Sequence, residues 1–349
     1  MTAAALIDTL PAAWYADPEV FQDERRRIFA RHWHLLGRRS QVAEAGDYIT
    51  GEVAGLPVFA VVGRDGVLRA FHNVCRPRAG PLFTDAGGTC QALRCRYHGW
   101  IYGFDGALRS APGFPDADAL DKKAFGLFPV RVETWQDLVF VCLDENAPDL
   151  GAWMGAVTEL AAPFPAMDDF VFHGEKTYEG ACDWKAYGDN SCEGYHLPFI
   201  HGELNKAVAS CDIRTYEDGG FVGFHVGYSG GVREAQGLWI YKFPAILLHF
   251  GVRSINVEQV EAVAPGRIRI RSLYWVPEGE AEYGDAYRAD SDLVIGEDMG
   301  VCERVQANLE AGLYKGGKLS PEKEPGTVFF QRLVRDALAQ PPVTLENRP

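Results

Sequence analysis

The chain of 349 residues is long enough for two domains, each with a substantial hydrophobic core. Hydrophobic residues make up 47% of it and charged residues 23%, as in ordinary soluble globular proteins. Its 48 acidic and 34 basic residues give a net charge of −14. This charge argues against nucleic acid or an anionic membrane as partner, because phosphate binding depends on an excess of lysine and arginine.

The sequence contains neither a recognisable secretion signal nor a membrane span. Its first 20 residues lack a basic segment followed by an apolar run. No stretch reaches the roughly 18 consecutive apolar residues that a transmembrane helix needs. We therefore predict a cytoplasmic protein, in which the eight cysteines indicate metal binding, catalysis or core packing rather than disulfides.

The first part of the chain is predicted to hold one helix and a small β domain. The helix begins at 17–19, Asp-Pro-Glu, which offers an N-cap, a proline for the first helical position and an acid for the positive end of the helix dipole. From 40 to 145 short runs alternate between apolar and polar residues. The triplets RDG at 64–66 and FDG at 104–106 are typical of hairpin turns, so this region is predicted to be all-β.

After residue 148 strand and helix patterns mix. The predicted elements are a short helix at 151–160, strands at 221–228, 238–260 and 267–276, and helices at 290–312 and 329–340. The second part of the chain is therefore expected to combine strands with helices.

The segment 72–100 contains side chains typical of an iron–sulfur motif. Cys95 and His98 lie within CRYHGW, and such a pair on a tight loop can hold a cluster or a metal ion. A Rieske [2Fe–2S] centre takes two cysteines and two histidines, one of each from two loops. Cys75 begins the other loop, but two positions later stands Pro77, whose side chain has no donor atom. Alone, so short a match favours two buried cysteines and an ordinary histidine.

A second group of potential ligands lies in 183–201, DWKAYGDNSCEGYHLPFIH. His196 and His201 are five positions apart, and Glu193 lies within one turn of His196 if this segment is helical. Pro198 is then expected to break or end the helix, so that a turn returns His201 to the site.

A distant carboxylate would complete this second group. Two histidines and one carboxylate form the facial triad of non-haem Fe²⁺ oxygenases, which leaves positions open for O₂ and substrate. The predicted helix at 290–312 offers Glu297 and Asp298. Each of these residues alone is more typical of a core or surface position, and only their combination favours a metal site.

With these motifs, nearly the whole chain resembles the α subunits of Rieske non-haem iron oxygenases, the aromatic ring-hydroxylating family. The resemblance extends over DPEVFQDERRRIFARHWHLLGR, GDYITGEVAGLPVFAVVGRDGVLRAFHNVC, CRYHGWIYGFDGAL, DWKAYGDNSCEGYHLPFIH and EDMGVCERVQ. It implies an α+β fold in which a Rieske all-β domain is inserted in a catalytic domain with a large antiparallel sheet and covering helices. The implied parts are an N-terminal helical part of the catalytic domain at 1–39, the Rieske domain at 40–147 and the mononuclear-iron domain at 148–349.

The resemblance also assigns roles to the candidate residues. The ligands of the [2Fe–2S] cluster would be Cys75, Cys95 and His98, and those of a mononuclear Fe²⁺ would be His196, His201 and Asp298. Several aromatic residues are candidates for a pocket, although most are more typical of a core: Trp184, Trp239, Tyr241, Phe243 and Phe250.

Two further residues near the iron motif are assigned by the resemblance. Glu193 occupies the position of the family's bridging acid, which links a cluster histidine of one subunit to an iron-binding histidine of the next and so implies a homotrimer. A glutamate there resembles the branch that acts on quaternary amines and related small substrates. Asn190 is expected to hydrogen-bond near the iron, although an asparagine in this place is as often a backbone cap.

The implied reaction is reductive activation of O₂ at Fe²⁺. A small organic substrate would be hydroxylated, dihydroxylated or oxidatively demethylated. Electrons would come from NAD(P)H through a separate reductase or ferredoxin, because the chain has no GxGxxG sequence after a strand.

In this family a histidine stands where the chain has Pro77. The cluster could assemble with a substitute ligand, such as His72 or water. Alternatively it does not assemble, and the chain is a relative deficient in electron transfer that acts as a non-catalytic iron-binding subunit. Pro77 could also be an engineered change or a sequence error in a working oxygenase. A zinc module of Cys75, Cys95 and His98 is a further alternative, but it ignores the second site. Because the other ligands are intact, the sequence favours an oxygenase.

Overall fold

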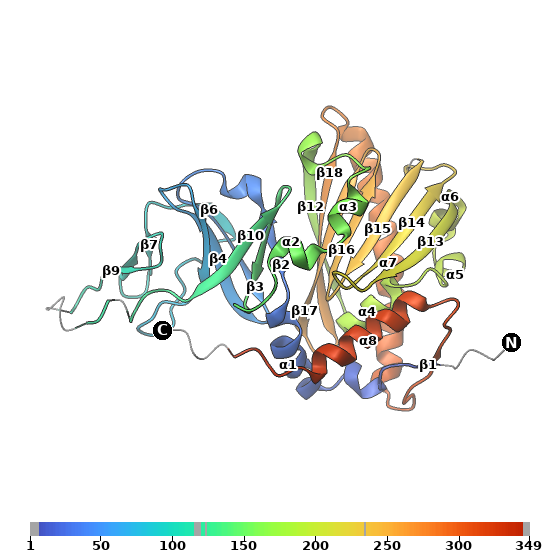
Figure 1. The fold of residues 1–349 in the computed structure, drawn as a ribbon, viewed down its shortest axis with the longest axis horizontal. Coiled ribbons are helices and arrows are strands. Elements are labelled where there is room, and N and C mark those ends of the chain that lie inside the picture. The colour runs from blue at the N-terminus through green and yellow to red at the C-terminus, as the bar shows by residue number, and fades with distance from the viewer. Residues whose placement is uncertain (1–6, 115–119, 123, 234, 345–349) are drawn as a thin grey trace. The chain divides into compact units, whose positions relative to one another are not determined.

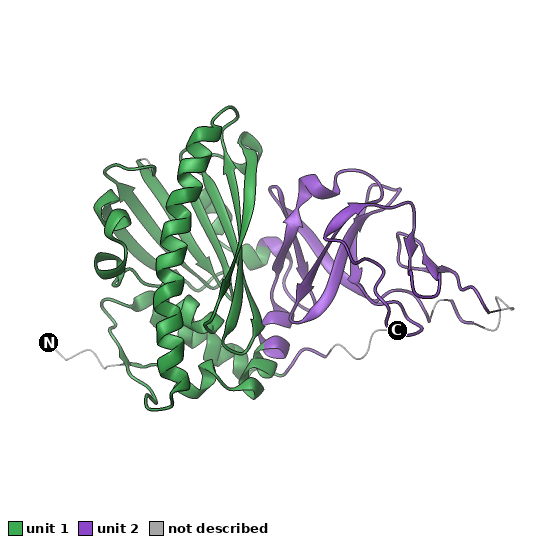
Figure 2. Ribbon diagram, turned by 180° about the vertical axis from the view of Figure 1, so that it is seen from behind, with its two compact units in different colours: residues 1–24, 152–341 green, residues 25–151, 342–349 purple. Residues whose placement is uncertain are grey.

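The computed structural model describes residues 7–114, 120–122, 124–233 and 235–344. The chain forms two compact units, one of residues 1–24 and 152–341 and the other of residues 25–151 and 342–349 (Figure 2). The second unit thus interrupts the first in sequence, and antiparallel sheets are combined with helices. This confirms the predicted α+β fold with an inserted domain.

The larger unit is built on an antiparallel sheet, whose strands within the described residues follow the order β12–β18–β17–β16–β15–β14–β13 (Figure 1). Their bounds are β12 (Val171–Gly180), β13 (Val208–Tyr216), β14 (Phe221–Tyr228), β15 (Gln236–Lys242), β16 (Ile246–Gly251), β17 (Ile255–Ala264) and β18 (Arg267–Val276). The strands predicted at 221–228 and 267–276 are confirmed. The predicted strand 238–260 is instead three strands, β15, β16 and part of β17, because tight turns reverse the chain twice within it.

Helices cover this sheet, and the long helix α7 (Ala281–Glu310) packs against β18 and β12 (Figure 2). The other elements of this unit are β1 (Ile7–Asp8), η1 (Ala12–Tyr15), α3 (Val157–Ala161), η4 (Met167–Asp169), α4 (Trp184–Ser191), α5 (Leu197–Ile200), α6 (Gly202–Ala207), β19 (Lys318–Leu319) and α8 (Pro325–Ala339). Both long helices begin before their predicted first residues, 290 and 329, because polar and glycine-containing first turns conceal the helical period. Two helices, α1 (Pro18–Arg27) and α2 (Leu150–Met154), run across the limits between the units.

The helix α4, which leads to the second ligand group, is fixed at its start by a buried cluster of charges. The carboxylate of Asp183 caps it by accepting a hydrogen bond from the N–H of Lys185 at 2.9 Å. The ammonium group of Lys185, fully buried, lies 2.6 Å from Asp183 and 2.5 Å from the equally buried Glu24 of α1. The indole of Trp184 donates a second hydrogen bond to Glu24 at 2.9 Å. These contacts hold the first turn of α4 in a single position.

The smaller unit contains a sheet in the order β2–β11–β10–β5–β4–β3–β6 and a second sheet β7–β8–β9. Its elements are η2 (Phe29–Arg31), β2 (His34–Arg38), η3 (Arg39–Val42), β3 (Asp47–Val53), β4 (Leu56–Val62), β5 (Leu68–His72), β6 (Gly87–Thr89), β7 (Leu93–Arg94), β8 (Ile101–Tyr102), β9 (Leu108–Ser110), β10 (Pro129–Trp135) and β11 (Leu138–Cys142). The predicted turns at 64–66 and 104–106 are confirmed, and their glycines have φ of +74° and +82°. Strand β2 pairs with β11, so residues 25–39 belong to this unit rather than to the N-terminal part of the larger one.

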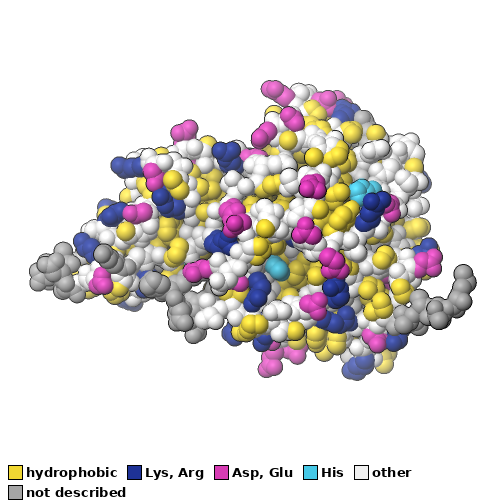
Figure 3. All heavy atoms as spheres, viewed as in Figure 1, with side chains coloured by type: hydrophobic (Ala, Val, Ile, Leu, Met, Phe, Trp, Pro, Cys, Tyr) yellow, Lys and Arg dark blue, Asp and Glu magenta, His cyan; other side chains and the backbone are white. Residues whose placement is uncertain are grey.

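The surface carries acidic and basic side chains interspersed among apolar ones on the face shown in Figure 3. The net charge of −14 is therefore not gathered into one field on that face. Within the described residues no helix combines the length and the apolar character that crossing a membrane requires.

Candidate functional site

Two loops of the smaller unit carry its candidate cluster ligands, and they share one hydrogen-bond pattern. The N–H of Cys75 donates to the carbonyl five positions later at 2.8 Å, and that of Cys95 does the same at 2.9 Å. The N–H of Ala79 closes the first loop onto the carbonyl of Cys75 at 2.9 Å, and Gly99 closes the second onto Cys95 at 3.0 Å. Ala79 and Gly99 both have a positive φ, +56° and +73°. Pro77 therefore lies in a loop that has the same closure as its counterpart.

The donor atoms of these loops do not amount to a complete ligand set for a Rieske cluster. The thiols of Cys75 and Cys95 are buried, with 2% and 0% of each residue exposed. The ring of His98 is exposed and stacks on Tyr97 at 3.8 Å. The side chain of Pro77, where the fourth ligand belongs, has no donor atom. The residues present therefore do not fit a [2Fe–2S] cluster held by four protein ligands.

Two alternatives were suggested for these loops: His72 as a substitute cluster ligand, and a zinc site. The positions of the residues bear on both. Burial raises the pKa of Cys75 to about 11, although the hydroxyl of Tyr102, 3.3 Å from its sulfur, acts in the opposite direction. The ring of His72, on β5, is turned edge-on to Phe128 at 6.5 Å. Among the described residues, one set of three potential ligands has all its donor atoms within 4.8 Å, and it does not include Cys75, Cys95 or His98. A single zinc ion bound by those three is therefore not supported.

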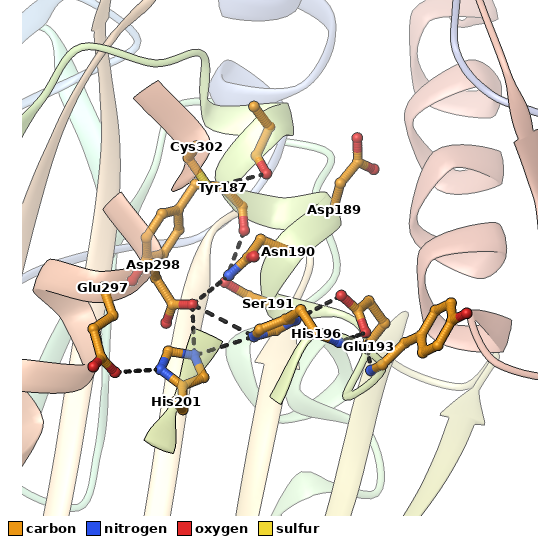
Figure 4. Close-up of polar contacts among 12 residues, drawn as sticks. Tyr187, Asp189, Asn190, Ser191, Glu193, His196, His201, Glu297, Asp298 and Cys302 are labelled. Atoms are coloured by element: carbon orange, nitrogen blue, oxygen red, sulfur yellow. Dashed lines mark hydrogen bonds and ion pairs between the residues drawn. The ribbon is translucent and has the colours of Figure 1, made fainter. Parts of the chain in front are cut away.

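The set that does converge is His196, His201 and Asp298, in the larger unit (Figure 4). Nε2 of His196 lies 3.2 Å from Nε2 of His201, and Oδ1 of Asp298 lies 3.5 Å and 3.0 Å from these two nitrogens. His196 precedes α5, His201 follows it, and Asp298 comes from the middle of α7. The structure thus brings together all three residues that the sequence proposed as ligands of a mononuclear iron.

These three donor atoms fit a small divalent transition metal ion. Ligand atoms at about 2.1 Å from an ion, and at right angles to each other, lie about 3.0 Å apart. The three distances of 3.0–3.5 Å are close to that value. Two imidazoles and one carboxylate on one face are the donor set that non-haem Fe²⁺ oxygenases use, with the opposite face left open.

A glutamate contacts Nδ1 of each histidine in this set, on the side of the ring opposite Nε2. Oε1 of Glu193 lies 2.6 Å from Nδ1 of His196, and Oε2 of Glu297 lies 2.7 Å from Nδ1 of His201. These contacts turn both Nε2 atoms toward the centre of the set, an arrangement that makes imidazoles better ligands. The sequence offered both Glu297 and Asp298 as the carboxylate ligand. In the structure Asp298 lies with the donor atoms, and Glu297 contacts the opposite side of His201.

The local structure around His196 differs from the expected helix. Helix α4 ends at Ser191, and Glu193 reaches His196 through a turn in which it also accepts hydrogen bonds from backbone N–H groups. Pro198 does not end a helix but lies in the first turn of α5, where a proline without an N–H is tolerated. The turn forms because the carboxylate of Glu193 satisfies the N–H groups that a continuing helix would have bonded.

Asn190 and the electrostatics of the set also favour a cation at its centre. The amide of Asn190 donates to Oδ1 of Asp298 at 2.6 Å, so this side chain is not a backbone cap. Burial lowers the pKa of His196, but hydrogen bonds and charge from Asp298 and Glu193 outweigh it and raise this pKa to about 9. Hydrogen bonds and charge from His196 and His201 lower the pKa of Asp298 against the effect of its burial. Positive charge is thus strongly stabilised between these side chains.

A cavity of about 740 Å³, partly open to solvent, adjoins the three ligand atoms. Its walls come from α4, α7 and strands β14 to β17, and aromatic rings form much of them, among them Tyr187, Phe224, Trp239 and Tyr241. Apolar and aromatic walls with a few polar groups among them are typical of small-molecule sites. Of the aromatic residues proposed from the sequence, Trp239 and Tyr241 line this cavity, while Trp184, Phe243 and Phe250 lie elsewhere.

The sequence missed the charged side chains of the cavity wall. Glu258 on β17 and Arg233, before β15, both line it. The guanidinium of Arg233 donates to Asp290 at 2.8 Å and lies over the ring of Tyr287. The strand sequence INVEQVEAVA contains no signal that singles out Glu258, because Asn256, Gln259 and Glu261 are polar as well.

Comparisons with known proteins agree with this arrangement. The sequence model of the Rieske [2Fe–2S] domain matches residues 32–127, and that of the ring-hydroxylating α subunit catalytic domain matches residues 167–242 and 226–340. Choline monooxygenase of Spinacia oleracea is 28% identical over 346 residues, which are 95% of this chain and 78% of that protein. The oxygenase subunit of carnitine monooxygenase of Escherichia coli K12 is 32% identical over 201 residues, 57% of this chain and 54% of that protein.

Solved structures show the same fold. The quaternary ammonium Rieske monooxygenase CntA in complex with L-carnitine has a TM-score of 0.84 at 24% identity, covering 95% of this chain and 96% of that chain. Naphthalene 1,2-dioxygenase from Rhodococcus sp. has a TM-score of 0.82 at 19% identity, covering 96% and 95%. The chain is an enzyme of the Rieske oxygenase class and belongs to the ring-hydroxylating oxygenase α subunits, in which a Rieske domain precedes the catalytic domain.

Proposed function

We propose that the chain is the α subunit of an iron-dependent monooxygenase that oxidises a small alkylammonium compound. The observation that carries this proposal is the convergence of His196, His201 and Asp298 beside a cavity with aromatic walls. The printed names of the relatives, choline monooxygenase and carnitine monooxygenase, support the substrate class. In the proposed reaction one atom of O₂ enters a C–H bond of the substrate, and two electrons and two protons convert the other atom to water.

Each residue of the centre has a proposed role. His196, His201 and Asp298 hold Fe²⁺, which supplies the redox chemistry for O₂ reduction when it is bound. Glu193 and Glu297 keep the two imidazoles in position. Asn190 donates a hydrogen bond to the carboxylate of Asp298, and the aromatic walls of the cavity exclude water from the substrate. Dihydroxylation or oxidative demethylation would use the same residues, so the position oxidised depends on how the substrate lies in the cavity.

The proposal requires partners for electron transfer. We propose a separate reductase or ferredoxin that carries electrons from NAD(P)H, and a cytoplasmic homotrimer in which Glu193 bridges two subunits. The carboxylate of Glu193 has one oxygen 2.6 Å from Nδ1 of His196, which supports a role in linking that imidazole to a neighbouring group.

Pro77 favours a second candidate function. Because this loop has no fourth ligand, the chain could be an iron-binding subunit that cannot receive electrons from a Rieske cluster. The closed loop around Cys75 supports the first function instead, since the architecture for cluster binding is intact apart from one donor.

One experiment separates these candidates. Protein purified without O₂ is analysed for iron and acid-labile sulfide, then reduced chemically and mixed with O₂ and choline or carnitine. The oxygenase requires iron at the mononuclear site and an oxidised product detected by mass spectrometry. About two acid-labile sulfides per chain would show that a [2Fe–2S] cluster assembles in the wild type with a substitute ligand. One iron without sulfide or product supports the non-catalytic subunit. Protein that binds no iron at the His196–His201–Asp298 site contradicts both functions.

A further inference from the structure

Glu258 is a buried carboxylate that has no partner in the part of the chain that the structure describes. The residue is 2% exposed and lines the cavity. Its backbone lies between two paired strands, opposite Leu247 and Ser272, but no described residue forms a hydrogen bond or an ion pair with its side chain. A buried acid in such surroundings is unfavourable unless something neutralises or solvates it.

The positive charge that acts on Glu258 is already neutralised by another residue. Arg233, whose charge acts on Glu258, donates to Asp290 at 2.8 Å, and its other N–H groups donate to Tyr287 and Ser291 at 3.3 Å and 3.4 Å. Burial, followed by the negative charge of Asp298, raises the pKa of Glu258 to about 8. The cavity wall therefore contains a carboxylate that would be stabilised by a cation beside it.

Glu258 lies in an aromatic part of the cavity close to the metal ligands. On the sheet face it is aligned with Leu247 and Tyr241, the opposed residues on β16 and β15. Tyr187, Glu258 and Asp298 all line the cavity, and the charges of the two acids add to the effect of burial, which raises the pKa of Tyr187 well above its ordinary value. Aromatic faces combined with one carboxylate are the surroundings that bind quaternary ammonium groups.

We propose that Glu258 binds the cationic head group of the substrate and so makes the cavity selective for a cation over a neutral molecule of the same shape. This inference rests on the proposed function and adds to it the residue that recognises the positive charge of the substrate. Because the head group is held at Glu258, the uncharged end of the substrate extends toward His196, His201 and Asp298. Glu258 thus sets specificity and substrate position and is not a metal ligand.

The test compares two ligands that differ in charge alone. Protein with Fe²⁺ in the mononuclear site is titrated without O₂ with choline and with 3,3-dimethylbutan-1-ol, in which carbon replaces the ammonium nitrogen. Wild-type protein is expected to bind choline at least 10-fold more tightly. Glu258→Gln is expected to weaken choline binding on the order of 10-fold to 100-fold and to leave binding of the neutral alcohol within about 2-fold.

A matched control and a stability measurement exclude a structural explanation. Glu261→Gln, on the same strand but outside the cavity lining, removes one negative charge beside Arg269 and is expected to leave binding of both ligands unchanged. Thermal unfolding of the metal-free Glu258→Gln protein is expected at the same or a higher temperature, because the substitution removes a buried carboxylate without a partner.

The possible failures are distinguishable. If wild-type protein binds choline tightly and Glu258→Gln binds it equally well, the inference fails and the proposed function stands. The inference also fails if the variant loses both ligands equally or unfolds at a clearly lower temperature, since Glu258 is then a structural residue. If wild-type protein does not prefer choline to the neutral alcohol, the proposed alkylammonium substrate fails and the inference fails with it.

Discussion

Oε2 of Glu297 lies 2.7 Å from Nδ1 of His201, on the opposite side of the imidazole from Asp298. These two neighbouring acids on α7 therefore hold one histidine from two sides. Asp298 points to the donor set, and Glu297 fixes the orientation of the ring from behind (Figure 4). The first prediction follows from this difference.

Glu297→Ala is expected to weaken Fe²⁺ binding by about 10-fold to 100-fold, because the carboxylate orients His201 without contacting the metal site. Asp298→Ala removes a donor atom and is expected to abolish stoichiometric binding. Titration of metal-free protein with Fe²⁺ in the absence of O₂ measures both effects. Glu282→Ala, exposed in the first turn of α7, is the control and should bind as the wild type does. Equal losses for Glu297→Ala and Asp298→Ala would contradict the separate roles.

His196→Ala is expected to remove the mononuclear iron and leave any iron–sulfur chromophore unchanged. The reason is that His196 and the cysteine loops belong to different compact units. Iron analysis together with the visible absorption spectrum checks both parts of this expectation. Simultaneous loss of iron and sulfide would show that the two sites are not independent.

Pro77→His is expected to provide the missing imidazole donor and to allow a stoichiometric [2Fe–2S] cluster to assemble. The loop tolerates the change because its closure depends on backbone hydrogen bonds of Cys75 and Ala79, not on the side chain at position 77. Acid-labile sulfide of about two per chain and a Rieske-type absorption spectrum are the measurements. Pro77→Ala, which changes the backbone without adding a donor, is the control. A variant with histidine that gains no sulfide relative to this control would mean that the loop is assigned incorrectly.

Lys185→Met is expected to lower the free energy of unfolding by about 3–5 kcal/mol, because Glu24 and Asp183 would remain buried without a counter-charge. Both carboxylates are within 2.6 Å of the ammonium group. Urea unfolding is the measurement. Lys206→Met, which breaks an exposed pair with Glu203, is expected to change the value by less than about 0.5 kcal/mol. Similar values for the two variants would refute the role of the buried cluster in fixing α4.

The pH dependence of stability is expected to include a contribution from His34. Burial lowers its pKa from 6.5 to about 4, despite a hydrogen bond from its ring to the carbonyl of Phe29. Between these pH values the unfolded chain binds a proton that the folded protein does not, so stability is present above pH 6.5 and falls as the pH drops toward 4. The loss amounts to about 3 kcal/mol. Unfolding of His34→Gln should show a correspondingly smaller fall over this range, and parallel curves would disprove the contribution.

Much of the fold and of the metal centre was predictable from contiguous stretches of sequence. The turns at 64–66 and 104–106 are marked by their own glycines. The two histidines at 196 and 201 lie in one short segment whose spacing is a local property of the chain. The single departure at Pro77 was visible for the same reason, since the loop that contains it is defined by Cys75 and the residues directly after it.

The tertiary structure decided the parts of the site that depend on distant elements. Glu297 and Asp298 are equivalent in sequence, and only the angle at which α7 packs on the sheet turns one toward the ligands and the other behind His201. Glu258 could not be recognised from the sequence, because its significance depends on the absence of a described partner and on a cavity built from several strands and helices. The sequence by itself determined the family and the metal-binding residue types. Which acids face the metal and which face the substrate was decided by packing, because long-range contacts alone orient side chains from separate elements toward one point.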